Sequence, residues 1–264
     1  MLTVVIPTYN RIDLTDNAIN SIICESPSLI KIIVVDDCGT TPYTHSNENA
    51  SGIKVSVIQL DKNVGAGMAR KFGVEYADSQ YISFLDSDDS YDPEWLNYVL
   101  ELLQKQNPNE MIFISGITQG EKKYAGLIRK LIAEFPFKKQ LFATRIIVTQ
   151  FNPFYTPSIV MSKDLCTFKE GLRYCEDYYT NAFALFFAHK IYLPPITACH
   201  LGRTPNSLGG VSAEKTKMHQ GELIVRWDLL TTNKLTIMYK ILILVGMCYQ
   251  LTRMLIKSFL EKIQ

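Results

Sequence analysis

The sequence has few of the features that mark zinc, redox or nucleic-acid-binding proteins. Its six cysteines are scattered and form no C-x-x-C pair, which argues against a zinc ribbon and a redox dithiol and fits reduced thiols in the cytosol. The formal net charge is only +1, so the chain as a whole has no excess positive charge for nucleic acid. We therefore expect no nucleic-acid partner.

Two common phosphate-binding motifs are also absent. No G-x-G-x-x-G follows the first apolar run, and no G-x-x-x-x-G-K-[ST] occurs anywhere in the chain. This excludes the usual dinucleotide and P-loop cradles. A nucleotide bound by this chain would therefore need a metal ion for its phosphates.

The sequence also lacks a secretion signal and a clear membrane span. MLTVVIPTYNR has no basic start, long apolar stretch or small-residue cleavage site, so we expect folding to begin at residue 2 and the chain to stay in the cytosol. The apolar tail at 235–264 has an uncharged part, 241–252, that is shorter than the about 20 residues of a bilayer span. Two interpretations remain open: a peripheral helix in the membrane interface, or a helix packed on the domain.

The first half of the sequence alternates between apolar runs and helical patterns. Apolar, β-branched runs predict strands at residues 2–6, 30–37, 54–60, 81–85 and 111–115, and helical spacing predicts helices at 12–24, 66–77 and 93–106. Strands that alternate with helices of about a dozen residues predict βαβ units and a parallel sheet. The expected fold class is therefore α/β, with helices on both faces of a Rossmann-like sheet.

Polar residues cluster where four of these strands end, at 7–11, 36–37, 61–65 and 86–89. Ligands bind at the carboxyl ends of parallel strands, so the clusters should converge on one crevice. The fourth group, DSDD, places three carboxylates within four residues, and like charges so close raise each other's pKa unless a cation lies among them. Mg²⁺ and Mn²⁺ prefer oxygen ligands. From the residues alone, a metal site and a solvated turn both remain open.

Five segments, in this order and spacing, resemble the inverting glycosyltransferases of family 2: VVIPTYNR, IIVVDDCG, NVGAGMARKFGVEYA, ISFLDSDD and GLRYCEDYYTNAFAL. The resemblance covers about residues 2–210. It implies the GT-A fold, with a nucleotide-sugar-binding α/β half at 1–116 and an acceptor-binding and catalytic half at 117–212. Residues 213–264 would then form a helical tail, open to membrane association.

The resemblance also implies a set of donor-site residues. Asp88 is the expected ligand of a divalent metal, Mn²⁺ or Mg²⁺, in a D-x-D motif, and Asp86 would face the ribose and diphosphate beside the same metal. The remaining residues expected to bind the nucleotide-sugar are Pro7, Thr8, Tyr9, Arg11, Asp36, Asp37, Asn63, Arg70, Ser87 and Arg203. Lys71 stands where the family pattern often has Asn, which is a departure from the pattern.

The chemistry needs a base for the acceptor hydroxyl as well as a stabilised leaving group. A metal that neutralises the departing diphosphate removes the need for a leaving-group acid. The family's E-D pair implies Asp177 as the base and Glu176 as a positioning residue. Both acids also stand where a helix should begin, and acids are favoured in the first turn, so capping and catalysis are compatible interpretations.

Two residues near the end of the matched region complete the predicted site. A lone histidine usually has no special role, but many family members carry a late His or Arg in a segment that closes over the donor. By this resemblance His200 is the candidate third metal ligand and Arg203 a candidate diphosphate contact. The glycines and Pro205 that follow are typical of a loop that orders over a bound donor.

The predicted function is a metal-dependent inverting glycosyltransferase. It would move a sugar from a nucleotide-sugar, a UDP-sugar, to a glycan acceptor linked to polyprenyl diphosphate at the inner face of a bacterial membrane, in O-antigen, capsule or exopolysaccharide assembly. Basic residues among apolar ones at 122–139 fit contact with an anionic membrane or carrier, or a solvated helix face. Two alternatives stay open: a sugar-nucleotide nucleotidyltransferase, and a non-catalytic glycan or lipid-carrier binding module.

Overall fold

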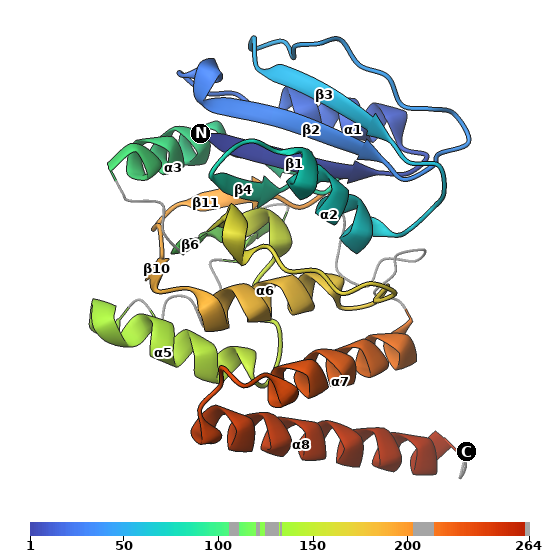
Figure 1. Cartoon of the computed structure of the whole chain (residues 1–264), viewed down its shortest axis with the longest axis vertical. Helices are drawn as coiled ribbons and strands as arrows, with labels where there is room; N and C mark the ends of the chain where they lie inside the picture. The colour runs from blue at the N-terminus through green and yellow to red at the C-terminus, as the bar shows by residue number, and fades with distance from the viewer. Residues whose placement is uncertain (106–110, 120–121, 125–131, 133, 203–213, 262–264) are drawn as a thin grey trace.

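The computed structural model describes the 264-residue chain except for residues 106–110, 120–121, 125–131, 133, 203–213 and 262–264. Within this described part, a seven-stranded sheet has the order β10-β6-β9-β4-β1-β2-β3, and a smaller four-stranded sheet has the order β5-β11-β7-β8 (Figure 1). The strands of the large sheet are β1 (Leu2–Thr8), β2 (Ile30–Asp36), β3 (Lys54–Gln59), β4 (Tyr81–Phe84), β6 (Met111–Ile114), β9 (Ile159–Ser162) and β10 (Lys190–Tyr192).

The small sheet contains β5 (Ser90–Tyr91), β7 (Gly116–Gln119), β8 (Lys122–Tyr124) and β11 (Thr197–His200). The helices are α1 (Ile12–Asn20), α2 (Ala66–Tyr76), α3 (Pro93–Lys105), α5 (Phe137–Val148), α6 (Glu176–Phe187), α7 (Lys215–Thr231) and α8 (Ile237–Glu261). Short 3₁₀ helices lie at η1 (Pro27–Leu29), η2 (Thr156–Ser158) and η3 (Lys163–Leu165). The expected α/β alternation of the first half is confirmed.

The register of the large sheet brings the predicted polar clusters to one edge. β1 pairs in parallel with β2 and with β4, and β2 pairs in parallel with β3, so the carboxyl ends of these four strands point the same way. β9 is antiparallel to both β4 and β6. All seven residues of β1 are buried, as expected for a strand covered by helices on both faces.

Successive side chains of β1 point to opposite faces of the sheet and pack in different apolar clusters. Val4 packs in one buried apolar cluster with Ile19 of α1 and Trp95 of α3, while Val5 packs in a second cluster with residues of α2 and α6. The second face is close-packed because Gly73 of α2 has no side chain; a Cβ there would lie 2.4 Å from a methyl carbon of Val5.

The helices of the C-terminal half stack in layers on one side of the large sheet. Figure 1 shows α5, α6, α7 and α8 stacked below the sheet, with α8 outermost. Several apolar residues of α8 are exposed: Ile237, Met238, Ile241, Leu244, Val245, Tyr249 and Leu251. Among the residues that the structure describes, none of the helices combines the length and apolar character needed to cross a membrane.

Candidate active site

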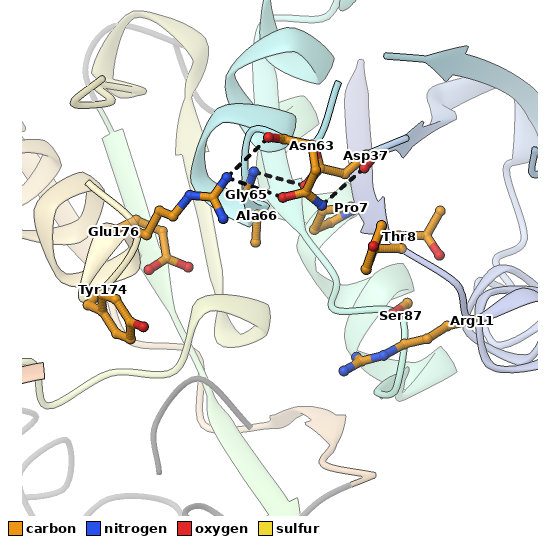
Figure 2. A pocket seen from close by; sticks show the side chains of 12 residues that line it. Pro7, Thr8, Arg11, Asp37, Asn63, Gly65, Ala66, Ser87, Tyr174 and Glu176 are labelled. Carbon is orange, nitrogen blue, oxygen red and sulfur yellow. Dashed lines mark hydrogen bonds between the residues drawn. The ribbon is translucent and has the colours of Figure 1, made fainter. Parts of the chain in front are cut away.

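A pocket of about 390 Å³ opens at the carboxyl ends of β1 and β2 (Figure 2). It is lined by Pro7, Thr8, Tyr9, Arg11, Asp37, Asn63, Gly65, Ala66, Ser87, Arg173, Tyr174 and Glu176. Eight of these were predicted as site residues from the sequence. The convergence follows from the parallel register, because strands that run side by side deliver their following loops to the same edge.

The loop after β1 turns sharply to present its side chains. Asn10 adopts a left-handed backbone with φ of +53°, which Asn tolerates better than most residues. Its Oδ1 accepts a hydrogen bond from the Thr40 backbone N–H at 2.7 Å, which holds the turn. Tyr9 projects outward and is 46% exposed, while the hydroxyls of Thr8 and Thr15 are 2.6 Å apart and join the strand to α1.

The two aspartates that end β2 hold different loops. Asp37 accepts hydrogen bonds from the backbone N–H groups of Val64 at 2.7 Å and Gly65 at 2.8 Å. It therefore fixes the start of α2, where Gly65 has a φ of +89°. Asp36 is buried and accepts from the N–H groups of residues 39 and 43 at 2.9 and 2.8 Å, so it shapes the neighbouring turn and does not line the pocket.

The aspartates of the D-x-D motif are each paired with an arginine. Arg70 Nη2 lies 2.6 Å from Asp86 Oδ1, and Arg11 Nη1 lies 3.2 Å from Asp88 Oδ2. Asp89 accepts the backbone N–H of Gly202 at 2.9 Å, and burial, followed by the charge of Asp86, raises its pKa to about 8. The carboxylate cluster is therefore stabilised by two guanidinium groups and by uptake of a proton near neutral pH.

Arg70 joins this motif to the acids of α6. Its guanidinium is buried, with a side chain that is 7% exposed, and Nη1 lies 3.3 Å from Glu176 Oε1. Among the described residues, its Nε has no hydrogen-bond partner. Gly67 makes room for this arrangement, because a Cβ there would come within 2.8 Å of the Glu176 side chain.

The predicted base, Asp177, lies next to this network in a buried environment that raises the pKa of its carboxyl group. Asp177 Oδ2 accepts a hydrogen bond from Asn152 Nδ2 at 3.0 Å. Burial raises the pKa of Asp177, and burial together with the Asp177 charge raises the pKa of Glu176 to about 7, against the lowering effect of Arg70. A carboxylate with a raised pKa is a better proton acceptor at neutral pH.

The structure also locates the two late residues of the predicted site. His200 lies on β11 opposite Ser90, and its Nε2 is 3.8 Å from Asp92 Oδ2, so here it faces Asp92. The segment nevertheless adjoins the D-x-D motif, because a Cβ added to Gly202 would lie 1.7 Å from the Asp88 carbonyl oxygen. Arg203 lies outside the described residues.

A divalent metal fits the chemistry of Asp86 and Asp88. Their carboxylates supply the oxygen ligands that Mg²⁺ and Mn²⁺ prefer, and they flank Ser87, which lines the pocket. Within the described part of the chain, no three or more His, Cys, Asp or Glu side chains gather as a metal-binding group. The third ligand of the predicted set therefore stays a prediction.

Arg173, Tyr174 and Asn152 are among the residues of the site that were not predicted. Arg173 and Tyr174 line the pocket, and Arg173 Nη2 donates to the Asn63 backbone oxygen at 3.1 Å. They directly precede Cys175-Glu176 in a segment already singled out, so their position was a usable signal. Asn152 lies in a stretch without a recognisable motif, and no local pattern indicates that its amide reaches Asp177.

Sequence comparison with known proteins identifies the family of this chain. The Glycosyl transferase family 2 model matches residues 3–161. Over 203 residues the chain is 27% identical to the succinoglycan biosynthesis protein ExoO of Rhizobium meliloti, covering 74% of this chain and 58% of that protein. Over 109 residues it is 30% identical to the putative teichuronic acid biosynthesis glycosyltransferase TuaG of Bacillus subtilis, covering 40% of this chain and 43% of TuaG. The chain thus spans about half the length of these relatives.

Solved structures of low sequence identity share the fold. S. aureus TarS 1–349 in complex with UDP-GlcNAc aligns with a TM-score of 0.68 at 18% identity, covering 94% of this chain and 72% of that one. The mannosyltransferase PcManGT from Pyrobaculum calidifontis, in complex with GDP-Man and Mn²⁺, aligns with a TM-score of 0.62 at 15% identity, covering 94% and 69%. The predicted GT-A fold is confirmed. Since the family model matches more than half of its residues, the chain belongs to glycosyl transferase family 2.

Proposed function

We propose that this chain is a glycosyltransferase that moves a sugar from a UDP-sugar to a glycan acceptor in bacterial surface polysaccharide synthesis. The observation that carries the proposal is the position of Arg70, which contacts Asp86 of the D-x-D motif and Glu176 of the E-D pair. One buried guanidinium thereby connects the motif that would bind the donor to the acids that would act on the acceptor. The names of the relatives in teichuronic acid and succinoglycan synthesis support the pathway class.

The residues that line the pocket are suited to bind a nucleotide. Tyr9 presents an exposed ring on which a base can stack, and Asp37 with Asn63 supplies acceptors and donors for uracil and ribose edges. UDP and UDP-GlcNAc in complexes of the similarly folded TarS support a uridine donor for this chain. The GDP-Man complex of PcManGT makes GDP the natural competitor to test.

Asp88, with Asp86, would hold a divalent cation under the diphosphate. Such a cation, when bound, neutralises the charge that develops on the departing diphosphate. Arg11 lines the same pocket and places its guanidinium beside Asp88, so it adds positive charge where the phosphates would lie. His200 and Arg203 keep their predicted roles as third ligand and diphosphate contact.

Asp177 would act as the base of an inverting transfer. Its carboxylate takes the proton of the acceptor hydroxyl while that oxygen forms a bond to the anomeric carbon. The bond from this carbon to the diphosphate oxygen breaks on the opposite face, and the diphosphate keeps the electron pair. Asn152 holds Asp177 Oδ2 in place, and Glu176 positions Arg70. An α-linked UDP-sugar would give a β linkage.

The acceptor would be a glycan on a polyprenyl diphosphate at the cytoplasmic face of the membrane. The exposed apolar residues of α8 support a peripheral contact, because exposed apolar surface of this kind marks membrane or partner binding. Lys240 on the same helix adds positive charge suited to anionic lipid headgroups.

Calorimetric titration of UDP and GDP into the purified protein, with Mn²⁺ and with EDTA, tests the proposal. We expect UDP to bind more tightly than GDP, to need the metal, and to lose at least about tenfold in affinity in Asp88→Ala, because one charged ligand is lost. Absence of nucleotide binding under both conditions would refute the proposed function.

A further inference from the structure

A second cavity, of about 400 Å³, lies between α7, α8 and the segment that follows α5. It is lined by Gln150, Phe151, His219, Glu222, Arg226, Gly246, Tyr249 and Gln250, and it shares no residue with the donor pocket. Two glycines allow the helices to approach this region closely. A Cβ at Gly246 would lie 3.1 Å from the Thr149 carbonyl oxygen, and one at Gly221 would lie 2.4 Å from that of Tyr174.

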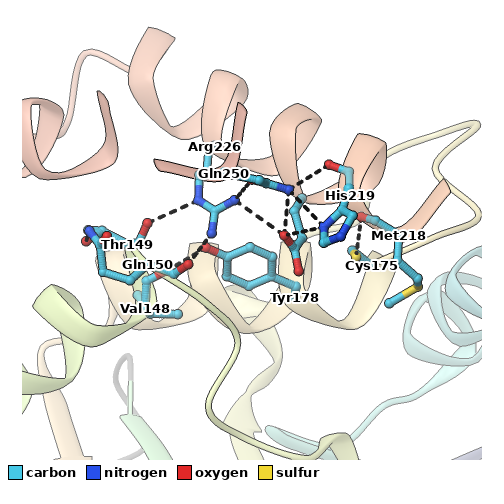
Figure 3. Close-up of polar contacts among 10 residues, drawn as sticks. Val148, Thr149, Gln150, Cys175, Tyr178, Met218, His219, Arg226 and Gln250 are labelled. Atoms are coloured by element: carbon cyan, nitrogen blue, oxygen red, sulfur yellow. Dashed lines mark hydrogen bonds and ion pairs between the residues drawn. The ribbon is translucent and has the colours of Figure 1, made fainter. Parts of the chain in front are cut away.

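The floor of the cavity is a hydrogen-bonded network centred on Arg226, whose side chain is 3% exposed (Figure 3). Its guanidinium donates to the backbone oxygens of Thr149, at 3.2 Å, and of Gln150, and to the side-chain oxygen of Gln250. Gln250 Nε2 in turn donates to Glu222 Oε2 at 2.7 Å. These bonds hold the polar side chains in fixed positions before any ligand arrives.

The charges on this floor compensate one another. Arg226 Nη1 lies 3.6 Å from Glu222 Oε2, and His219 Nδ1 lies 3.6 Å from the same carboxylate. A phosphate or a nucleotide needs uncompensated positive charge, which the lining residues do not offer. The cavity therefore suits a ligand that is uncharged and rich in hydroxyl groups.

The walls add two aromatic rings. Both rings line the cavity, and Phe151 is 44% exposed and Tyr249 65% exposed. Aromatic faces flanking a carboxylate, amides and an imidazole can pack on the apolar face of a sugar ring while the polar groups bind its hydroxyls. This combination favours a saccharide over an apolar ligand.

The cavity is joined to the predicted base by a short stretch of backbone. Gln150 and Phe151 directly precede Asn152, which donates to Asp177. The ring of Tyr178, the residue after Asp177, lies 5.8 Å from the Arg226 guanidinium, and its hydroxyl donates a hydrogen bond to the Val148 carbonyl oxygen at 2.6 Å. The segment 148–152 therefore contains residues that line the cavity and a residue that is hydrogen-bonded to the predicted base.

We propose that this cavity is an acceptor subsite that binds sugar units of the growing glycan, away from the hydroxyl that reacts. The inference rests on the proposed function and adds to it the place where the acceptor chain is held. A glycan bound between Phe151 and Tyr249 would be retained through successive contacts while its end reaches Asp177.

The test uses the full-length protein and an array of defined oligosaccharide fragments of bacterial O-antigens, capsules and exopolysaccharides. Binding is compared for the wild type, Tyr249→Ala and Phe151→Ala, with UDP affinity and thermal midpoint measured on every protein. Two control variants accompany them: Tyr76→Ala, equally 65% exposed but on α2, and Val245→Ala, 57% exposed on α8 but not part of the cavity lining.

We expect at least one fragment to bind the wild type and to lose about tenfold or more in affinity in Tyr249→Ala and in Phe151→Ala, because each variant lacks a ring on which the sugar would pack. UDP affinity and both controls should be unchanged. Equal binding by wild type and Tyr249→Ala would overturn the inference, as would an equal loss in Val245→Ala. UDP binding without binding of any fragment would also overturn it. Failure to bind UDP would instead count against the proposed function.

Discussion

Replacing Glu176 by Gln should make the protein more stable at neutral pH and less active. Arg70 faces three acids, Asp86, Glu176 and Asp177, so one buried guanidinium does not balance all of them. Burial and the Asp177 charge raise the pKa of Glu176 from 4.5 to about 7. Gln keeps the shape of the protonated side chain and removes the ionisation that folding opposes.

The sign of the pH dependence follows from proton binding. Between pH 4.5 and about 7 the folded wild type holds a proton on Glu176 that the unfolded chain releases. Its free energy of unfolding therefore falls as the pH rises through this window, and the loss is complete above pH 7. Since one pKa unit corresponds to about 1.4 kcal/mol, the full effect is about 3 kcal/mol. The 20% exposure of the Glu176 side chain reduces the expected value to about 2 kcal/mol.

Urea unfolding of the wild type and Glu176→Gln at pH 5, 6, 7 and 8 measures this difference. The free energy of unfolding of the variant should rise relative to that of the wild type by about 2 kcal/mol between pH 5 and pH 8. Its turnover should fall because Arg70 loses the negative charge of one of its partners. Glu75→Gln, on α2 with a 57% exposed side chain, is the surface control and should follow the wild type. Parallel pH curves for the wild type and Glu176→Gln would refute the reasoning.

Two further predictions concern neighbouring parts of the site. Asp177→Asn should lower kcat by a factor of about 100 or more, because a general base is lost, with UDP affinity unchanged in calorimetry; near-normal turnover would remove Asp177 from its proposed role. Gly202→Ala should destabilise the protein by about 1–3 kcal/mol in urea unfolding and weaken donor binding, because its Cβ would overlap the Asp88 carbonyl. A fully stable Gly202→Ala protein would show that the segment at 200–202 does not pack on the D-x-D motif.

The sequence by itself determined the alternation of the first half and the edge where the site would lie. Strand and helix periodicities are local properties, and buried β-branched runs such as 30–36 have few other stable environments. The parallel arrangement that they predict brings strand ends together, so Thr8, Asp37 and Ser87 reach one pocket without further information. The E-D pair at the start of α6 was equally visible, because acids and a helical pattern follow one another there.

Only the tertiary structure decided which charges pair and what surrounds them. Arg70 and Glu176 are 106 positions apart, and Arg11 and Asp88 are 77 apart, so no local pattern specifies either contact. The packing of α6 against α2 sets the first pair, and the turn after β1 sets the second. The same holds for the amide of Asn152 on Asp177 and for the cavity between α7 and α8. These features depend on how whole elements dock, and docking is governed by close packing at positions such as Gly67, Gly221 and Gly246, whose importance appears only when the neighbouring chain is in place.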